Sequence, residues 1–196
     1  FFHCRGANAL LEYKHFSGVQ APAKIFHLGY LLLLDKLDQE DAEFGVAAAR
    51  VLAHLRQKGY KTSVDVVSEQ SDRFKKIVIP CLPYVDYLIV NEIEAGATTG
   101  RLIRSGDGKI DSRNLLQAAQ ALIDGGVKEL VAIHFPEGGY ARTRDGRQCF
   151  EPSFLMAADE IRGTAGAGDA FCAGLLYGLH EGLPLGQVLK LANANA

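Results

Sequence analysis

The residues best suited to chemistry lie in a glycine-rich stretch near the end of the chain. Residues 163–169 read Gly-Thr-Ala-Gly-Ala-Gly-Asp, and apolar residues at helical spacing follow from Phe171 to Leu179, so the stretch opens a helix. The first N–H groups of a helix lack internal partners and carry the positive end of its dipole, which favours a bound phosphate. Close backbone packing would produce the same glycine-rich composition, so this segment alone leaves both interpretations open.

Asp169 places a carboxylate in the first turn of that expected helix. Phosphoryl transfer needs a group that orients the acceptor hydroxyl and takes its proton, next to donors that stabilise charge on the phosphoryl group. The glycine-rich stretch and its Asp169 supply both the proton acceptor and the backbone donors. Asp169 could instead only complement the helix dipole. We predict that it is the catalytic base of a kinase.

A second polar pair follows an apolar strand pattern at residues 85–90. Asn91 and Glu94 are three residues apart, which is also the spacing of a helix N-cap and its partner. Taken alone, the pair is better explained as a cap than as a functional site.

Several other groups receive structural interpretations. Asp65 ends a β-rich run and could face a cleft, but a strand-end Asp is more often a cap or a local acceptor. The basic groups at 101–104 and 142–147 are interpreted as solvated surface, although one arginine could reach ATP phosphates. Side chains interpreted as packing residues are His27, His134 and Cys172.

The elements that must position these residues alternate along the chain. Helical stripes cover residues 41–58 and 112–124, and β-rich runs cover 24–28, 62–67, 85–90 and 129–133. Glycine pairs and Asp145-Gly146 then predict an antiparallel hairpin. This order predicts a doubly wound α/β fold, in which ligands bind beyond the carboxyl ends of the strands.

Two motifs carry a family resemblance. Residues 163–171, Gly-Thr-Ala-Gly-Ala-Gly-Asp-Ala-Phe, resemble the Asp-Thr-x-Gly-Ala-Gly-Asp signature of the ribokinase-like carbohydrate kinases, or PfkB family. Residues 91–94 resemble the family's Asn-x-x-Glu motif after a strand. The resemblance implies a ribokinase-like three-layer α/β/α fold with a mainly parallel sheet, as a single, partial domain over residues 1–196.

The resemblance also implies roles for individual residues. Asp169 corresponds to the base, and Asn91 and Glu94 correspond to residues that organise magnesium and phosphate through water. The expected anion hole for ATP phosphate comprises Ala165, Gly166, Ala167 and Gly168. Gly138 and Asn195 fall where the family binds ATP, and Asn8 is a candidate substrate contact.

The ends of the chain and one motif position depart from the family pattern. Residues 1–8 resemble the end of a lid strand and its return, so most of the small β lid is expected upstream of Phe1, and the chain is expected to be incomplete at both ends. Gly163 stands where the signature has its first Asp, which puts metal handling in question. A family glycine is also replaced around Phe135-Pro136.

Composition limits the partners. The chain has 196 residues, 48% of them hydrophobic, with 21 basic and 23 acidic residues and a net charge of −2, which disfavours binding to nucleic acid or anionic membrane. Its longest early apolar run, residues 31–34, is far short of a membrane span. Four scattered cysteines without zinc spacing indicate reduced thiols and a cytoplasmic protein. The family further implies ATP, Mg²⁺, a monovalent cation as a candidate, and a homodimer.

The predicted function is ATP-dependent phosphorylation of a hydroxyl on a sugar or sugar-like molecule. A nucleoside or vitamin-like acceptor is the nearest alternative, and Gly163 motivates a third, a non-catalytic sugar- or nucleotide-binding relative. A Walker-type NTPase is excluded because Gly108-Lys109 lacks the rest of that motif, and a dinucleotide oxidoreductase is disfavoured because no Gly-x-Gly-x-x-Gly follows the early strands.

Overall fold

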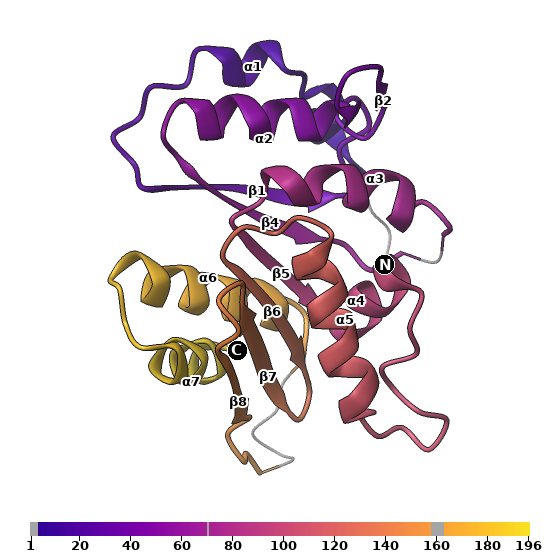
Figure 1. The fold of residues 1–196 in the computed structure, drawn as a ribbon, viewed down its shortest axis with the longest axis vertical. Coiled ribbons are helices and arrows are strands. Elements are labelled where there is room, and N and C mark those ends of the chain that lie inside the picture. Colours follow the sequence, from indigo (N-terminus) through magenta and orange to yellow (C-terminus); the bar gives the residue numbers. More distant parts are fainter. Residues whose placement is uncertain (1–3, 70, 158–162) are drawn as a thin grey trace.

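A six-stranded sheet forms the centre of the molecule (Figure 1). The computed structural model describes residues 4–69, 71–157 and 163–196, and its main sheet has the order β1-β4-β5-β6-β7-β8. The parallel strands are β1 (Ile25–Leu31), β4 (Lys61–Val66), β5 (Tyr87–Asn91) and β6 (Leu130–Phe135). Two antiparallel strands, β7 (Gly138–Thr143) and β8 (Gln148–Pro152), complete it. The predicted mainly parallel sheet and its hairpin are confirmed.

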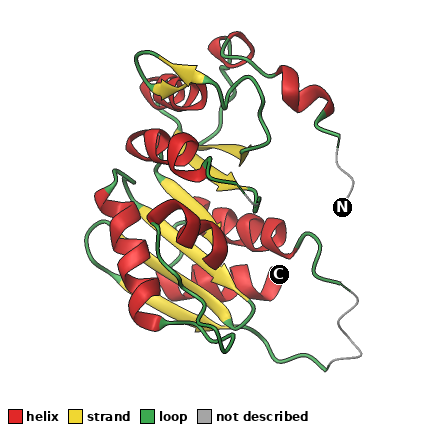
Figure 2. Cartoon of the chain, turned by 90° about the vertical axis from the view of Figure 1, so that its right-hand side faces the viewer, coloured by secondary structure: helices red, strands yellow, loops and turns green. Residues whose placement is uncertain are grey.

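Helices cover both faces of this sheet, which gives three layers (Figures 1 and 2). On one face lie α2 (Ala47–Gln57), α3 (Phe74–Cys81), α4 (Glu92–Thr99) and α5 (Ser112–Asp124). On the other lie α6 (Ala167–His180) and α7 (Leu185–Asn195). The doubly wound α/β prediction is therefore confirmed.

Strand β5 shows why the sheet needs helices on both sides. Its side chains alternate in direction, as in any strand, and Leu88 and Val90 enter the core beneath α2–α5. Tyr87 and Ile89 enter the second core, beneath α6 and α7. All four are buried, so the strand appears in the sequence as a continuous apolar run.

The helix predicted over residues 41–58 begins later than expected. Two short strands, β2 (Glu40–Asp41) and β3 (Gly45–Val46), form a separate antiparallel pair before α2 starts at Ala47. The Asp41 carboxylate accepts the N–H groups of Glu43 and Phe44 at 3.0 Å, and Gly45 has a φ of +80°. A side-chain-capped turn and a left-handed glycine therefore replace the first helical turns.

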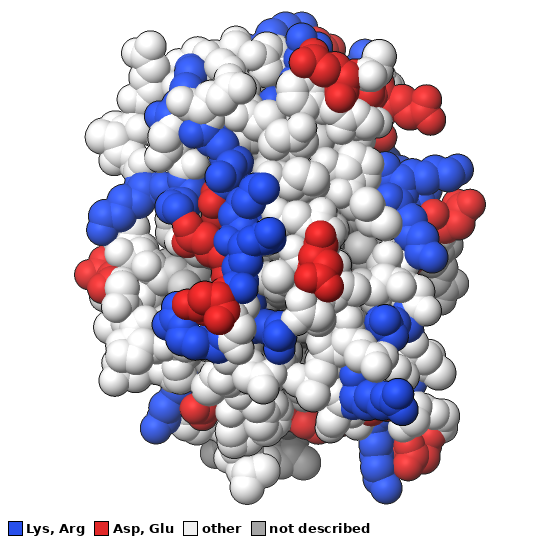
Figure 3. All heavy atoms as spheres, viewed as in Figure 1, with Lys and Arg blue, Asp and Glu red and all other residues white. Residues whose placement is uncertain are grey.

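Near the amino end, the structure has short turns of helix. A 3-10 helix covers Gly6–Leu10, and α1 covers Lys14–Ser17. The lid strand expected at the start of residues 1–8 falls partly on residues 1–3, which lie outside the described residues. Among the described residues, no helix is long and apolar enough to cross a membrane. On the face shown in Figure 3, basic and acidic side chains are interspersed.

Candidate active site

Polar side chains from four parallel strands gather at the carboxyl edge of the sheet. Tyr30, Asp65, Asn91 and His134 each lie at or near the end of their strand, β1, β4, β5 and β6 respectively. The first turn of α6 lies over the same edge, because Tyr30 donates a hydrogen bond from its hydroxyl to Asp169. A Cβ added to Gly168 would also lie only 3.2 Å from Cε1 of His134. The structure thus brings the two predicted motifs to one edge.

The N-terminus of α6 presents backbone rather than side chains. Gly166 is the N-cap, with a left-handed φ of +87°, and no side chain caps the helix. The N–H of Ala167 donates to the Thr164 carbonyl at 3.2 Å, which tightens the turn. A Cβ on Gly166 would meet nothing within 4 Å, so glycine is needed there for its conformation, not for space. Such a turn can bind an anion through its free N–H groups.

Asp169 is exposed in this first turn, and its described side-chain partner is Tyr30. Burial and the contact with Asp169 both raise the pKa of the Tyr30 phenol, so the hydroxyl remains protonated and acts as the donor. The bond engages one oxygen of the Asp169 carboxylate. Sequence reasoning missed Tyr30, although the rule that active residues follow strands could have drawn attention to it.

The pair Asn91 and Glu94 forms a complete capping box at the start of α4. The Asn91 side chain accepts the N–H groups of Ile93 and Glu94, and the Glu94 carboxylate accepts the Asn91 N–H at 2.9 Å. The other Glu94 oxygen accepts from the Ser68 hydroxyl at 2.7 Å and from the Asn91 amide at 2.9 Å. The capping interpretation is therefore confirmed, and any further role must coexist with it.

These bonds bear on how the pair could serve a magnesium ion. The Glu94 carboxylate already accepts three of about four hydrogen bonds that it can accept. Direct coordination would break the capping box, whereas a water-mediated contact fits because Mg²⁺ keeps much of its hydration shell. Burial raises the pKa of Glu94 to about 7, so the carboxylate is only partly charged at neutral pH. A nearby cation would lower this pKa and favour the charged form.

Asp65 is a buried carboxyl group with few hydrogen-bond donors and no basic partner among the described ion pairs. It is 5% exposed, and one of its oxygens accepts the Val66 N–H at 2.7 Å. Burial, with the nearby carboxylates of Glu94 and Asp169, raises the pKa of Asp65 to about 8. The interpretation as a local acceptor is confirmed by the bond to Val66, but Asp65 also faces the site that contains Asp169.

The predicted nucleotide residues lie where the hairpin meets α6 and α7. Gly138 pairs with Phe135 and Pro152 between β6 and β8, and a Cβ there would lie 2.3 Å from the Glu151 carbonyl oxygen. Asn195 donates to the Ala170 carbonyl at 2.7 Å, which ties the end of α7 to the first turns of α6. Asn195 therefore contacts α6 directly, whereas Gly138 packs within the hairpin.

Other predicted residues lie apart from this group or behave differently. Asn8 is exposed in the short 3-10 helix, where its backbone makes local bonds to Arg5 and Leu11. Within the basic group at residues 101–104, interpreted as solvated surface, Arg104 is 23% exposed and pairs with Glu92 and Glu137, each at 2.9 Å, so it ties α4 to the β6–β7 turn. His134 does pack, against the Phe171 ring at 5.0 Å between centroids.

The family model for "pfkB family carbohydrate kinase" matches residues 1–196, the whole chain. The chain belongs to the PfkB family. Solved structures agree with this fold. The tetrameric inhibited form of phosphofructokinase-2 from Escherichia coli matches with a TM-score of 0.68 at 16% identity, over 93% of this chain and 53% of that one.

Two further kinase structures are similar to this PfkB chain. Adenosine kinase from Sinorhizobium meliloti matches with a TM-score of 0.64 at 20% identity, covering 96% of this chain and 51% of that one. Arabidopsis thaliana ribokinase, complexed with ribose and ATP, matches with a TM-score of 0.60 at 22% identity, covering 74% and 43%. The predicted ribokinase-like fold is thus confirmed, and the chain spans about half the length of these structures.

Proposed function

We propose that this chain carries the catalytic part of an ATP-dependent kinase that phosphorylates a hydroxyl of a sugar or sugar-like small molecule. The observation that carries the proposal is Asp169, exposed in the first turn of a helix whose glycine-rich N-terminus has no side-chain cap. Base and anion site would then lie within one helical turn, so that a hydroxyl activated by the base is next to the phosphoryl group that it attacks. Membership of the PfkB family supports the reaction class.

In the proposed mechanism, Asp169 accepts the proton of the attacking hydroxyl while Tyr30 fixes its orientation. The backbone of Ala165, Gly166, Ala167 and Gly168 stabilises the charge on the transferring phosphoryl group. Asn91 and Glu94 would hold Mg²⁺ through water, and this ion supplies charge neutralisation on the ATP phosphates when bound. Gly138 and Asn195 would border the nucleotide, and Asn8 the acceptor.

Substitution of Asp169 tests the proposal. In the full-length protein, we expect Asp169→Asn to lower kcat/KM by about 10²–10⁴-fold, the usual contribution of a general base. The control is Asp124→Asn, an exposed carboxylate at the end of α5 that accepts from Gln120. ADP release with a panel of sugars, nucleosides and vitamin-like alcohols identifies the acceptor. Activity near wild type in Asp169→Asn would remove Asp169 from the role of base.

Gly163 is the reason to consider a second candidate function, that of a non-catalytic binding protein. It replaces the first Asp of the family signature, and the position is exposed with open space around it. A non-catalytic relative that binds a sugar or nucleotide would show saturable binding without ADP formation at saturating magnesium-ATP. The same assay should establish whether a monovalent cation contributes. Homodimer formation and a cytoplasmic location also belong to the proposal, and sedimentation of the purified protein tests the first.

A further inference from the structure

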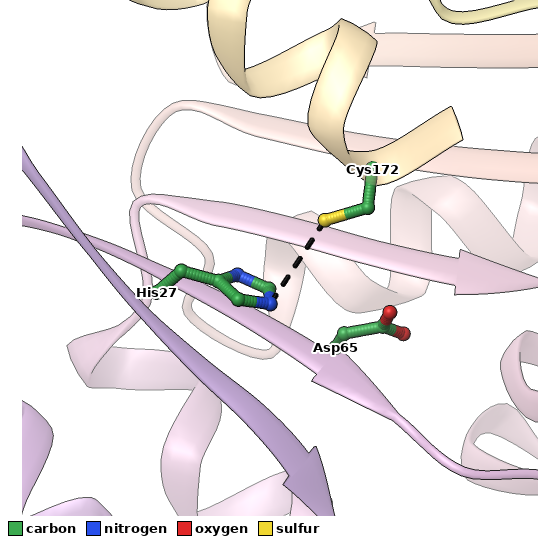
Figure 4. Close-up of side chains that lie close together, drawn as sticks. All are labelled: His27, Asp65 and Cys172. Carbon is green, nitrogen blue, oxygen red and sulfur yellow. Dashed lines mark hydrogen bonds between the residues drawn. The ribbon is translucent and has the colours of Figure 1, made fainter. Parts of the chain in front are cut away.

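Three side chains with metal-binding atoms converge beside the proposed base (Figure 4). His27 comes from β1, Asp65 from β4 and Cys172 from α6. The Nε2 of His27 lies 4.0 Å from the Sγ of Cys172, and the potential ligand atoms of all three residues lie within 4.8 Å of one another. Elements far apart in sequence thus place a nitrogen, an oxygen and a sulfur around one point.

A second contact orients the histidine for this purpose. The Nδ1 of His27 lies 3.0 Å from the Ser63 hydroxyl, so that nitrogen is engaged and Nε2 faces the other two groups. Metal-binding histidines are commonly oriented by such a bond from the second ring nitrogen.

The acidic groups at this point are also buried without a basic partner among the described ion pairs. Asp65 and Cys172 are 5% and 4% exposed, and the described ion pairs give Asp65 no basic partner. Asp169 and Glu94 add further negative charge nearby. A buried carboxylate without a partner is unfavourable, and a divalent cation would offset the charge of one carboxylate and one thiolate.

The ligand types select the kind of cation. Imidazole, carboxylate and thiolate together suit Zn²⁺ and similar ions, whereas Mg²⁺ prefers oxygen ligands alone. Tetrahedral Zn²⁺ with bonds of about 2.0–2.3 Å needs its ligand atoms roughly 3.5 Å apart. The observed separations, all within 4.8 Å, need to shorten by up to about 1.3 Å, and side-chain rotations at the exposed His27 can supply part of this.

We propose that His27, Asp65 and Cys172 form a site for a thiophilic divalent cation of the Zn²⁺ class, which inhibits phosphoryl transfer when occupied. Cys172 follows Asp169 by three residues, so both lie on one face of α6, and an ion held by Cys172 would lie near the proposed base. Binding releases the thiol and carboxyl protons to solvent, and the site becomes neutral overall.

Cobalt absorption tests the metal site without any reference to activity. The full-length protein, stripped with a chelator, is titrated with Co²⁺, and we expect a saturable thiolate-to-cobalt band in the near-ultraviolet that Zn²⁺ abolishes. Cys172→Ser should remove this band, and His27→Gln should weaken Co²⁺ binding at least about 10-fold. Matched controls are Cys149→Ser and His15→Gln, with thermal melts to verify folding. No band in wild type, or a band that survives in Cys172→Ser, would overturn the site.

Inhibition forms a separate arm, which rests on the proposed kinase function. At saturating magnesium-ATP, micromolar Zn²⁺ should inhibit the wild-type enzyme, and Cys172→Ser should relieve this inhibition at least about 10-fold. Equal inhibition of wild type and variant would overturn the inhibitory role, because the zinc would then act elsewhere. If no acceptor supports ADP formation, the kinase proposal fails, while the cobalt band still decides whether the metal site exists.

Discussion

Two buried aspartates at opposite ends of the sheet have opposite surroundings. Asp86 precedes β5 at the amino edge, and Asp65 lies near the end of β4 at the carboxyl edge; they are 1% and 5% exposed. Asp86 pairs with the Arg56 guanidinium and accepts from the backbone N–H and hydroxyl of Thr62, at 2.8 and 3.1 Å. Asp65 accepts from the adjacent backbone and faces other carboxylates.

The difference shows that a buried aspartate at the amino edge stabilises the fold, whereas one at the carboxyl edge lies among the candidate site residues. At the amino edge, a buried charge is matched by a cation and hydrogen bonds, so it holds α2, β4 and β5 together. At the carboxyl edge, Asp65 is buried beside other carboxylates, which raises its pKa and leaves it able to respond to a ligand, a proton or a cation. Substitutions at the two edges should therefore act on different quantities.

The largest expected difference in stability is between these two aspartates. Asp86→Ala should lower the free energy of unfolding by about 3 kcal/mol, because it leaves Arg56 and the Thr62 donors without their acceptor. Asp65→Asn should raise it by about 1 kcal/mol at pH 7 in the presence of a chelator. Urea denaturation measures both.

The sign for Asp65 follows from its raised pKa. The unfolded carboxyl loses its proton near pH 4, but the folded one keeps it until about pH 8, so folding at pH 7 requires proton uptake. Stability from this group is full below about pH 4 and is lost as the pH rises towards 8. The gain in Asp65→Asn should therefore vanish at low pH; a gain that is unchanged at pH 4 would contradict this explanation.

Two left-handed glycines with open space form the next comparison. Gly59 follows α2 at the amino edge with a φ of +93°, and Gly166 caps α6 at the carboxyl edge with a φ of +87°. Either change to alanine should cost about 1–2 kcal/mol of stability, because a Cβ strains this conformation. Only Gly166→Ala should also lower kcat, by about 10-fold or more. Equal kcat values in the two variants would place the anion site elsewhere.

Two side-chain caps on helices of the same face sharpen the comparison further. Asn91 caps α4 and Asp111 caps α5, where its carboxylate accepts the Asn114 N–H at 3.0 Å. Asn91→Ala and Asp111→Ala should each cost about 1 kcal/mol of stability. If Asn91 also organises magnesium, its variant alone should need more Mg²⁺ for half-maximal activity. The same Mg²⁺ requirement in both would leave Asn91 as a cap only.

Sequence patterns predicted the parts of the fold that depend on local signals. The helix over 112–124 has regular apolar spacing, and the glycine turn before Phe171 combines small residues with a helical stripe, so both are visible within a few residues. The start of α2 was misplaced because apolar spacing continues through Phe44, while the Asp41 turn and Gly45 prevent a helix there. The apolar spacing at the start of this segment is compatible with a helix and with a turn, and the hydrogen bonds of the Asp41 side chain favour the turn.

The candidate site was predicted only in part, because its remaining contacts join distant segments. Asp169 and Asn91 have motif neighbours, but Tyr30 reaches Asp169 across 139 residues, and Cys172 approaches His27 across 145. The order of strands in the sheet creates these contacts, and no short pattern records that order. His27 and Cys172 were therefore interpreted as packing residues. Only the three-dimensional structure shows that their side chains lie close to that of Asp65.

The smallest expected effects come from exposed ion pairs, which should be alike at the two edges. Lys61–Glu129 lies at the amino edge and Arg104–Glu137 at the carboxyl edge, with side chains between 23% and 50% exposed. Water and salt weaken such pairs, so Glu129→Gln and Glu137→Gln should each change the free energy of unfolding by less than about 0.5 kcal/mol. Urea denaturation at low and high salt measures this. A loss above 1 kcal/mol at one edge alone would mean that the two edges differ at their surfaces as well as in the partners of their buried aspartates.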